Sequence, residues 1–371
     1  MATGRGGKGD PTIWAIPIFF LTMAGEFLIH RRRAKLTGAT PGTYERKDTA
    51  TSLTMGTLSV VLPLLLPKVL RPLTPGKGRF GPALVGLAAT AVATTSIADR
   101  KVKQEQLHAE HDHSTPQGLT PIDRVARASG VAAIGLGLLA VSTWWASITS
   151  IDRLWSKRFF HLGRGPVAWL VALLGWDFIY YWNHRTMHER RFMWAIHVVH
   201  HSSERYNLST ALRQPVAEAL GTFVPYSALC LVGVTPELVL ASRGINLLYQ
   251  YWIHTELVGT LGAAEAVLNS PADHRVHHGV NPQYLDRNHG GILISWDKAF
   301  GTYEPEVETV RYGLTKNVDS FNPWTVITHA YRELAQDIAN SRSWRERLGH
   351  LLLEPGWGEK QRALREATPA A

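Results

Sequence analysis

The sequence predicts an all-α fold, a polytopic bundle of membrane-spanning helices with a histidine-rich cap at one membrane surface. Two observations predict it. Hydrophobic residues make up 45% of the 371-residue chain, and they are concentrated in long blocks separated by segments rich in Lys, Arg and His. Several blocks approach the roughly 20 apolar residues that a helix needs to cross about 30 Å of hydrocarbon. In addition, ten of the 17 histidines fall between residues 184 and 289, next to the ends of such blocks.

Five candidate spans precede most of these histidines, and two apolar segments follow: 12–30, 53–70, 81–98, 128–148 and 165–182, then 217–234 and 236–253. Pro63 and Pro67 make the second span the weakest, because proline interrupts helical hydrogen bonding. The first span lacks a small-residue cleavage site and is followed by the basic residues Arg31, Arg32, Arg33 and Lys35. It therefore predicts a retained anchor whose C-terminal end lies in the cytoplasm, rather than a cleaved signal peptide.

The net charge of +9 limits the classes of partner. The basic residues lie in short segments between the apolar blocks and not on one periodic helix face. This distribution favours an anionic membrane surface as the partner and disfavours nucleic acid. The single cysteine, Cys230, cannot form an internal disulfide, and a cysteine-based metal site is excluded. We detect no internal repeat, which disfavours transporter folds built from repeated halves.

Three consecutive regions are expected. Residues 1–125 comprise N-terminal membrane helices and a polar loop, and residues 126–312 comprise the membrane and histidine-box region. Residues 313–371 form the tail, in which apolar residues recur at helical spacing among many charges beyond residue 320. This pattern predicts one or two amphipathic helices that lie on the body of the protein or on the membrane surface.

Nine histidines recur at spacings that bring side chains together. In HRTMH the two histidines are four residues apart, so on a helix that continues from the span 165–182 they share one face. HVVHH and the HRVHH of DHRVHH both place histidines at positions i, i+3 and i+4, which are again neighbours on a helix. The segment QYWIHTE adds one further histidine. The nine are His184, His188, His197, His200, His201, His254, His274, His277 and His278.

The three histidine boxes, HRTMH (184–188), HVVHH (197–201) and HRVHH (274–278), are expected to meet on one side of the membrane. The first two follow directly after the span 165–182. Segments 217–234 and 236–253 are joined tightly through Val234, Thr235 and Pro236, so they can form a helical hairpin that dips into the membrane and returns. The third box then arrives on the side of the first two.

Eight or nine imidazoles are too many for core packing, because each buried ring would need its own hydrogen-bond partner. They are enough for two metal ions with coordination positions left open. Imidazole binds iron, copper, zinc and nickel, so the ligand type alone does not select the metal. The HExxH pattern of zinc proteases is absent, because Glu189 follows the second histidine of its box. A pair of irons would activate O₂ for attack on a lipid C–H bond. The alternative, a histidine-rich metal transporter, would place its ligands within the spans.

HRTMH, HVVHH and DHRVHH, together with NHGGILISWDKAFGTYEPE, resemble the membrane fatty acid hydroxylase and sterol desaturase superfamily. The phrases YYWNHRTMHE, MWAIHVVHHSSERYNLSTALRQ, QYWIHTE, LNSPADHRVHHGVNP and YLDRNHGG look most like its ether-lipid-cleaving subgroup, the alkylglycerol monooxygenases. The likeness is dense from residue 176 to residue 305 and weaker outside these bounds.

The resemblance implies a helical fold in a bacterial inner membrane, with a cytosolic di-iron centre held by the nine histidines. It implies O₂-dependent hydroxylation of a lipid, with cleavage of ether lipids as the first expectation. Hydroxylation or desaturation of a sterol, carotenoid or fatty acyl chain is the alternative. The electrons would come from tetrahydrobiopterin, as in the subgroup, or from another donor such as an electron-donor protein.

Two carboxylates are candidate catalytic residues. Glu189 matches an acidic residue that the subgroup carries after the first box, where it would bind or orient near the metals. Otherwise it is a solvated helix-face carboxylate near Arg185 and Arg190. Asp177 lies seven residues before His184, on roughly the same helix face, and it is expected to accept a hydrogen bond from a ligand imidazole.

Four further positions are candidates for the site. His289 stands where the family usually has tyrosine, so it is either a tenth ligand or a neutral replacement. In NLSTALRQ, three polar residues either line the substrate pocket or pair with the backbone. They are Asn207, Arg213 and Gln214.

Overall fold

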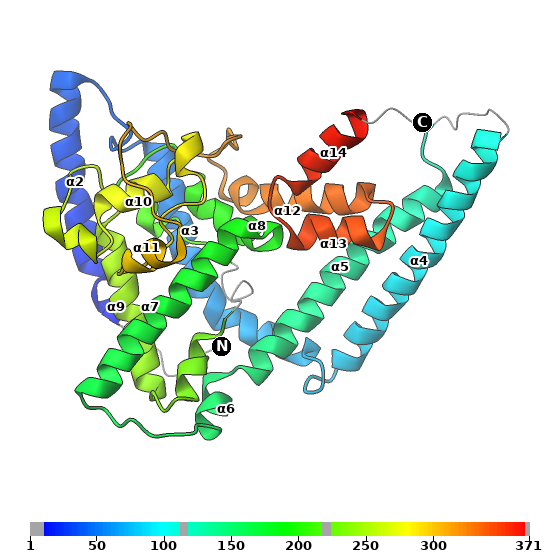
Figure 1. Cartoon of the computed structure of the whole chain (residues 1–371), viewed down its shortest axis with the longest axis horizontal. Coiled ribbons are helices and arrows are strands. Elements are labelled where there is room, and N and C mark those ends of the chain that lie inside the picture. The colour runs from blue at the N-terminus through cyan, green and yellow to red at the C-terminus, as the bar shows by residue number, and fades with distance from the viewer. Residues whose placement is uncertain (1–10, 112–117, 217–223, 368–371) are drawn as a thin grey trace. The chain divides into compact units, whose positions relative to one another are not determined.

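The structure, a computed structural model, describes residues 11–111, 118–216 and 224–367 (Figure 1). This part of the chain is built of helices and connecting loops. Its nearest approach to a sheet is one isolated β-bridge between Leu268 and Leu293. The predicted all-α fold is therefore confirmed.

Three helices of the described chain are long and apolar enough to cross a membrane. They are α3 (Arg46–Leu70, continued by the short 3-10 helix η1, Arg71–Leu73), α4 (Gly81–His111) and α5 (Pro121–Ile148). Between 6% and 22% of their most apolar stretches is buried inside the protein, so most of that surface is available to lipid. Pro63 and Pro67 lie within α3 without ending it. Helices in membranes tolerate proline where neighbouring groups satisfy the freed backbone.

The predicted spans 12–30 and 165–182 are also helical, but neither joins this set of apolar helices. α2 (Ile16–Thr37) contains Glu26 and a run of three arginines. α7 (Pro166–Glu189) contains Asp177 and several Trp and Tyr residues. Both carboxylates are buried, so these two helices pack against protein on their polar positions.

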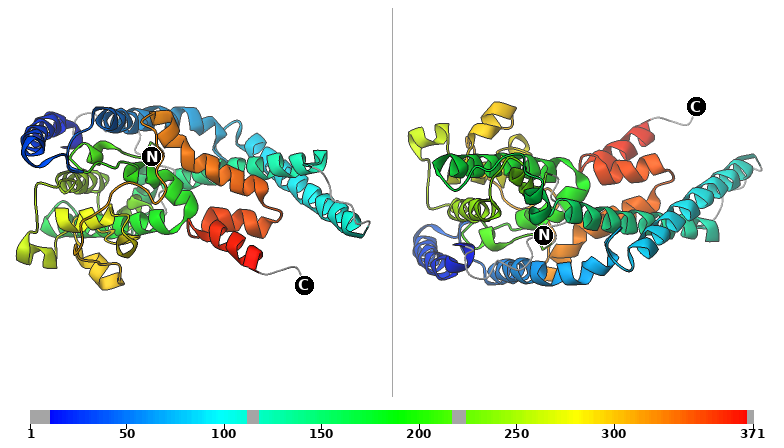
Figure 2. Two further views of the ribbon diagram at one scale, coloured as in Figure 1. Left: turned by 90° about the horizontal axis from the view of Figure 1, so that it is seen from above. Right: turned by 90° about the horizontal axis from the view of Figure 1, so that it is seen from below.

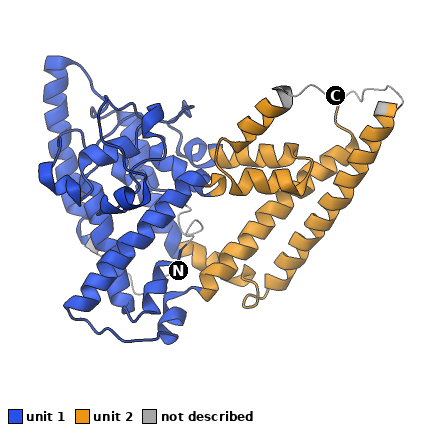
Figure 3. Cartoon of the chain, in the orientation of Figure 1, with its two compact units in different colours: residues 1–64, 149–189, 193–329 blue, residues 65–148, 190–192, 330–371 orange. Residues whose placement is uncertain are grey.

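The chain folds as two compact units, each assembled from segments that are separate in the sequence (Figure 3). The first unit comprises residues 1–64, 149–189 and 193–329, and the second comprises residues 65–148, 190–192 and 330–371. The units are thus interleaved along the chain, whereas the sequence suggests three consecutive regions.

The second unit is organised around α4 and α5, which run alongside each other (Figures 1 and 2). Ala98 of α4 packs against Ala126 of α5. The Thr95 hydroxyl donates a hydrogen bond to the Ser129 hydroxyl at 2.8 Å. Small residues and hydroxyls at a helix interface allow close approach and supply bonds between helices in a membrane.

The tail contributes α12 (Pro323–Asn340), α13 (Trp344–Leu352) and α14 (Trp357–Ala367). Leu334, Ile338 and Leu351 form a buried cluster against Val131 and other residues of α5. The tail thus forms three helices instead of one or two. Residues 330–340 of α12, and α13, pack on α5 within the second unit.

The first unit contains the remaining helices and 3-10 helices of the described chain. They are α1 (Pro11–Trp14), α6 (Ile151–Ser156), α8 (Arg191–His201), η2 (Thr210–Leu212), η4 (Tyr226–Cys230), α9 (Pro236–Trp252), η5 (Gly262–Ala266), α10 (Pro271–His277), η6 (Pro282–Tyr284) and α11 (Ser295–Phe300). Ala168, Ala172 and Trp176 recur on one face of α7 and pack against Leu238 and Val239 of α9. This core positions the C-terminal part of α7, which carries the first histidine box.

The predicted helical hairpin over residues 217–253 is wrong in its first arm. Its second arm is α9, where the Thr235 hydroxyl caps the helix by accepting from the Leu238 amide and Pro236 occupies the first turn. The described part of the first arm, 224–234, forms η4 and a turn. In that turn Gly233 has a φ of 90°, which a continuous helix does not contain. Residues 217–223 lie outside the described residues.

Candidate metal centre

Nine buried histidines meet in the first unit as two adjoining groups. Group A consists of His184, His188, His197, His201 and His277, and group B consists of His200, His254, His274 and His278. Within each group the ligand nitrogens lie within 4.8 Å of one another. The residues come from α7, α8, the turn after α9, and α10. They are the same nine histidines that the sequence singles out.

Each HxxHH box contributes histidines to both groups. The box 197–201 places its outer two in group A, whereas the box 274–278 places its outer two in group B. In HVVHH (197–201) the first and last histidines join group A, and the middle one, His200, joins group B. In HRVHH (274–278) the first and last join group B, and His277 joins group A. Residues i and i+4 lie almost above each other on a helix, whereas residue i+3 is rotated by about 60° to one side. Each box therefore bridges the two groups.

The spacing of the ring nitrogens suits metal binding. Four pairs of Nε2 atoms are 3.0 to 3.2 Å apart, namely His184–His197, His197–His201, His200–His254 and His254–His274. Two imidazole nitrogens bound at right angles to one metal ion, with bonds of about 2.1 Å, lie about 3.0 Å apart. Both groups therefore fit one metal ion each.

The positions of the ring hydrogens in group B also favour metal binding. Nδ1 of His254 lies 2.7 Å from the Gln250 carbonyl oxygen, and Nδ1 of His200 lies 3.3 Å from that of Arg213. A carbonyl oxygen only accepts, so both rings carry their hydrogen on Nδ1 and a lone pair on Nε2. These two lone pairs face each other at 3.2 Å. A cation bound between them would relieve their repulsion.

Burial keeps the imidazoles in the form that binds metal. Removal from water lowers the pKa of eight of the nine, to about 4 for His200 and well below the ordinary value for the other seven. Neighbouring imidazoles lower the pKa further, because protonating one ring disfavours charge on the next. The eight are His184, His197, His200, His201, His254, His274, His277 and His278. A neutral imidazole is the metal-binding species.

The loop 286–302, which includes the short helix α11, orients two rings of group A through its backbone. Nδ1 of His184 donates to the carbonyl oxygen of His289, and Nδ1 of His277 donates to that of Arg287, both at 2.9 Å. Nε2 of each ring then points to group A. Such partners fix the tautomer and the orientation of metal-binding histidines.

The beginning of the same loop is held in an unusual conformation. Asp286 and Asn288 have φ values of 56° and 55°, in the left-handed region that Asp and Asn tolerate better than most residues. The Asp286 carboxylate lies 3.5 Å from Nδ1 of His188. The buried Asn288 amide donates to the carbonyls of Asp273 (3.0 Å) and Glu304 (2.8 Å). These bonds compensate for the strained backbone.

Asp297 anchors the next part of the loop. Its buried carboxylate accepts hydrogen bonds from the amides of His289 (2.7 Å) and Gly290 (2.8 Å) and from the Thr302 hydroxyl (2.7 Å). The His289 carbonyl is therefore fixed where it receives the bond from His184.

Asp177 takes part in the site differently from the prediction. Its carboxylate accepts four hydrogen bonds, from the Ile292 and Leu293 amides, the Trp296 indole and the Asn246 amide, at 2.7, 3.1, 3.0 and 2.7 Å. None of these donors is an imidazole, so the predicted bond to a ligand ring is wrong. The loop lies against α7 at this level. A Cβ atom on Gly291 would be 2.7 Å from Asp177 Oδ1, so only glycine fits there.

Glu189 lies at the end of α7, outside both histidine groups. Its carboxylate pairs with the Arg185 guanidinium at 2.7 Å, and 40% of its side chain is exposed. Arg185 also donates to the Tyr181 hydroxyl. This is the helix-face arrangement that the sequence offered as the alternative to a role near the metals.

His289 is fully buried beside group A but belongs to neither group. Its ring centroid lies 5.0 Å from that of His188, its Nε2 lies 3.1 Å from the Asp286 carbonyl oxygen, and its Nδ1 has no partner among the described residues. Its defined contribution comes from the backbone carbonyl that orients His184.

The three polar residues of NLSTALRQ are engaged within the protein. The Asn207 side-chain oxygen, Oδ1, accepts from the Ser209 backbone amide and hydroxyl, and the Gln214 side-chain amide donates to the Ala211 backbone carbonyl. Arg213 forms a buried ion pair of 2.5 Å with Asp48 of α3. Asn207 and Gln214 thus pair with the backbone, as the second interpretation of NLSTALRQ expected. The Arg213 backbone carbonyl accepts a hydrogen bond from Nδ1 of His200.

Removing the Arg213 cation is expected to destabilise the first unit strongly. Arg213→Met would leave the Asp48 carboxylate buried without its cation, since both side chains are at most 4% exposed. The expected loss in free energy of unfolding is about 3–5 kcal/mol. Reversible unfolding in mixed detergent micelles would measure it. The double variant Asp48→Leu/Arg213→Met should recover much of the loss, and equal losses in both proteins would contradict the ion-pair explanation.

Sequence reasoning missed the residues that orient the histidines. Asp286, Asn288 and Asp297 lie after the last histidine box, in YLDRNHGG and SWDKAF. The Asp and Asn residues near paired glycines signalled a tight loop with left-handed positions. The carbonyl partners left no signal, because every residue has the same backbone.

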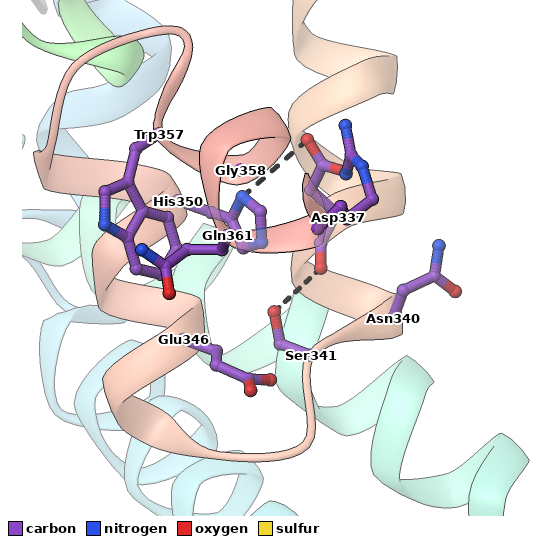
Figure 4. Close-up of a pocket in the computed structure, with 9 residues that line it drawn as sticks. Asp337, Asn340, Ser341, Glu346, His350, Trp357, Gly358 and Gln361 are labelled. Atoms are coloured by element: carbon purple, nitrogen blue, oxygen red, sulfur yellow. Dashed lines mark hydrogen bonds and ion pairs between the residues drawn. The ribbon is translucent and has the colours of Figure 1, made fainter. Parts of the chain in front are cut away.

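A separate pocket lies in the second unit. It is lined by Asp337, Asn340, Ser341, Glu346, His350, Trp357, Gly358, Gln361 and Arg362 and has a volume of about 190 Å³ (Figure 4). Ligand pockets usually occupy about 300–1,000 Å³. Asp337 is already paired with Arg191 (2.7 Å) and Arg362 (3.3 Å). The pocket is thus small and its charge is satisfied.

Comparisons with known proteins point to the histidine region. Human alkylglycerol monooxygenase is 44% identical over 213 residues, which are 57% of this chain and 48% of the human protein. The alkylglycerol monooxygenase of Danio rerio is 48% identical over 190 residues, 51% and 42% of the two chains. Ornithine lipid hydroxylase OlsE of Rhizobium tropici is 25% identical over 158 residues, 41% and 48% of the two chains. The chain spans about half the length of these relatives. No solved structure matches significantly.

The fatty acid hydroxylase family matches residues 169–302. This segment contains all nine histidines of groups A and B and the whole of the loop that orients them. The three helices that are long and apolar enough to cross a membrane indicate a membrane protein. Residues 169–302 are therefore similar to the fatty acid hydroxylase family.

Proposed function

We propose that the chain is a membrane-bound, non-haem di-iron oxygenase that hydroxylates a lipid. The observation that carries the proposal is the pair of all-histidine groups inside the segment that is similar to the fatty acid hydroxylase family. Groups A and B would each hold one iron. The irons would supply the binding and activation of O₂.

The protein's own residues would hold and orient the ligands. Backbone carbonyls of the loop 286–302 and of Gln250 and Arg213 keep the hydrogens on Nδ1, so Nε2 stays available. Burial keeps the rings neutral and removes water from around them. Asp177 and Asp297 fix the loop from two sides, which keeps group A assembled before and during the reaction.

The substrate class that we propose is an ether lipid of the alkylglycerol type. Support comes from the likeness to the human and Danio rerio alkylglycerol monooxygenases over the histidine region. Hydroxylation of the carbon beside the ether oxygen converts C–H to C–OH and gives a hemiacetal, which separates into an aldehyde and an alcohol. The other atom of O₂ takes up two electrons, from tetrahydrobiopterin or another donor, and two protons, and leaves as water.

Hydroxylation of a different lipid without cleavage is the second candidate. It is supported by the likeness to the ornithine lipid hydroxylase of Rhizobium tropici. Sterol, carotenoid and fatty acyl chains belong to this candidate, because an unactivated C–H bond would be attacked in each.

We infer that the histidines face the cytoplasm of a bacterial inner membrane. Arg31, Arg32, Arg33 and Lys35 lie at the C-terminal end of α2. Just beyond that end, the Pro41 carbonyl accepts from the Tyr206 amide, five residues after His201 of group A. The basic end of α2 and the histidines are therefore on one side, and basic residues favour the cytoplasmic side.

Lipid profiling tests the proposed function. Cells that receive alkylglycerols and express the intact protein should lose ether lipid and accumulate fatty aldehyde or its oxidation product. Cells that express His200→Ala should not, whereas His161→Ala, which replaces an exposed histidine outside both groups, should behave like the intact protein. New hydroxylated sterols or acyl lipids with unchanged ether lipids would favour the second candidate.

A further inference from the structure

Two stacked tyrosines adjoin group B. The ring centroid of Tyr206 lies 5.2 Å from that of His278 and 5.8 Å from that of His254. The Tyr312 ring stacks on Tyr206 with a centroid distance of 4.8 Å and an interplanar angle of 4°. Both rings are buried. A continuous aromatic stack therefore leads from the group B imidazoles to Tyr312.

The two phenol groups have different partners. The Tyr206 hydroxyl donates to the Ile253 carbonyl oxygen at 3.0 Å. The Tyr312 hydroxyl donates to Glu256 Oε1, also at 3.0 Å. A carboxylate can take a proton, whereas a peptide carbonyl is far too weak a base. Tyr312 thus has a proton acceptor in place, whereas Tyr206 has none within the described part of the chain.

The Glu256 carboxylate is itself positioned by the protein. Its second oxygen, Oε2, accepts from the Gly42 amide at 3.1 Å. The side chain is half-buried, so a proton taken from Tyr312 can pass on to water. Ring packing alone would be served equally well by phenylalanine at position 312, because the hydroxyl contacts a charged group and not the hydrophobic cluster around Tyr206 and Val310.

We propose that Tyr206 and Tyr312 form a redox relay that removes an oxidising equivalent from the metal centre when O₂ reacts without lipid in place. The proposal rests on the proposed function, which supplies the oxidant, an iron centre oxidised by O₂. One electron leaves Tyr312 and reaches that centre through the Tyr206 ring. The O–H bond of Tyr312 breaks and its proton goes to the Glu256 carboxylate. A neutral tyrosyl radical remains on Tyr312 until a thiol or another one-electron reductant in solution restores it.

Electron paramagnetic resonance after rapid freezing tests the relay. The full-length, iron-loaded protein in detergent would be reduced without oxygen, mixed with O₂ in the absence of lipid, and frozen. We expect a tyrosyl-radical signal that narrows when ring-deuterated tyrosine is incorporated. Tyr312→Phe should lose the signal, and Glu256→Gln should weaken it, because the amide does not accept the proton. Tyr251→Phe, which replaces another buried tyrosine bonded to a carbonyl, should retain it.

Iron oxidation, followed by Mössbauer spectroscopy in the same samples, distinguishes failure of the relay from failure of the proposed function. Iron that is oxidised by O₂ without a tyrosyl signal, or with an equal signal in Tyr312→Phe, overturns the relay and leaves the proposed function standing. Iron that O₂ does not oxidise without lipid overturns the relay, and iron that stays reduced also in a parallel sample with alkylglycerol overturns both. Iron content equal to that of the intact protein shows that Tyr312→Phe and Glu256→Gln have folded.

Discussion

Removing the outer histidines of one HxxHH box is expected to cost the protein one of the two irons that we propose for groups A and B. The intact chain should bind about two irons, because groups A and B each fit one ion. His274→Ala/His278→Ala leaves group B with two imidazoles and group A with all five. His197→Ala/His201→Ala leaves group A with three and group B with four. Each double variant should therefore retain about one iron per chain and lose lipid hydroxylation completely.

Metal analysis of purified, detergent-solubilised protein would measure this result, with His161→Ala as the control because that histidine is exposed and outside both groups. Loss of both irons from each double variant would show that the two groups do not bind independently. Bound zinc with only trace iron in the intact protein would contradict an oxygenase and favour metal handling.

The sequence predicted which histidines gather but not how they are divided. Spacings of three and four residues place histidines on one helix face, and that information is local. The assignment of His200 and His277 to the group opposite their box partners depends on how α8 and α10 face each other. That arrangement is a long-range property, and the sequence pattern holds no record of it. The same limit applies to His254, which has no box partner.

The helix prediction for α7 was correct, yet the predicted partner of Asp177 was wrong. Two helical turns do bring Asp177 and His184 to the same side of α7, as the spacing indicated. The Asp177 carboxylate and the His184 ring both bond instead to the segment 289–293, which comes from more than one hundred residues later in the chain. Helical periodicity describes a face of one helix, but it cannot predict which distant segment will cover that face.

Asp177→Ala is expected to release the loop that orients group A. The substitution removes the acceptor of four donors, from Ile292, Leu293, Trp296 and Asn246. Each buried donor left unsatisfied costs about 1–3 kcal/mol, so a loss of at least about 3 kcal/mol in free energy of unfolding is expected even after local rearrangement. The His289 carbonyl would lose its fixed position against His184, and metal affinity should fall about 10–100-fold, as for other changes to groups that orient ligands.

Hydrogen exchange and competition with an iron chelator would measure the two effects in the same protein. The amides of Ile292 and Leu293 should exchange faster in Asp177→Ala, and the iron of group A should be extracted before that of group B. Asp177→Asn retains one carbonyl oxygen as an acceptor and should give an intermediate result. Glu237→Ala removes an exposed carboxylate from α9 and should change neither measurement. Faster exchange with unchanged iron extraction would contradict the role of Asp177 in orienting group A. It would show that the histidines keep their positions when the loop is released.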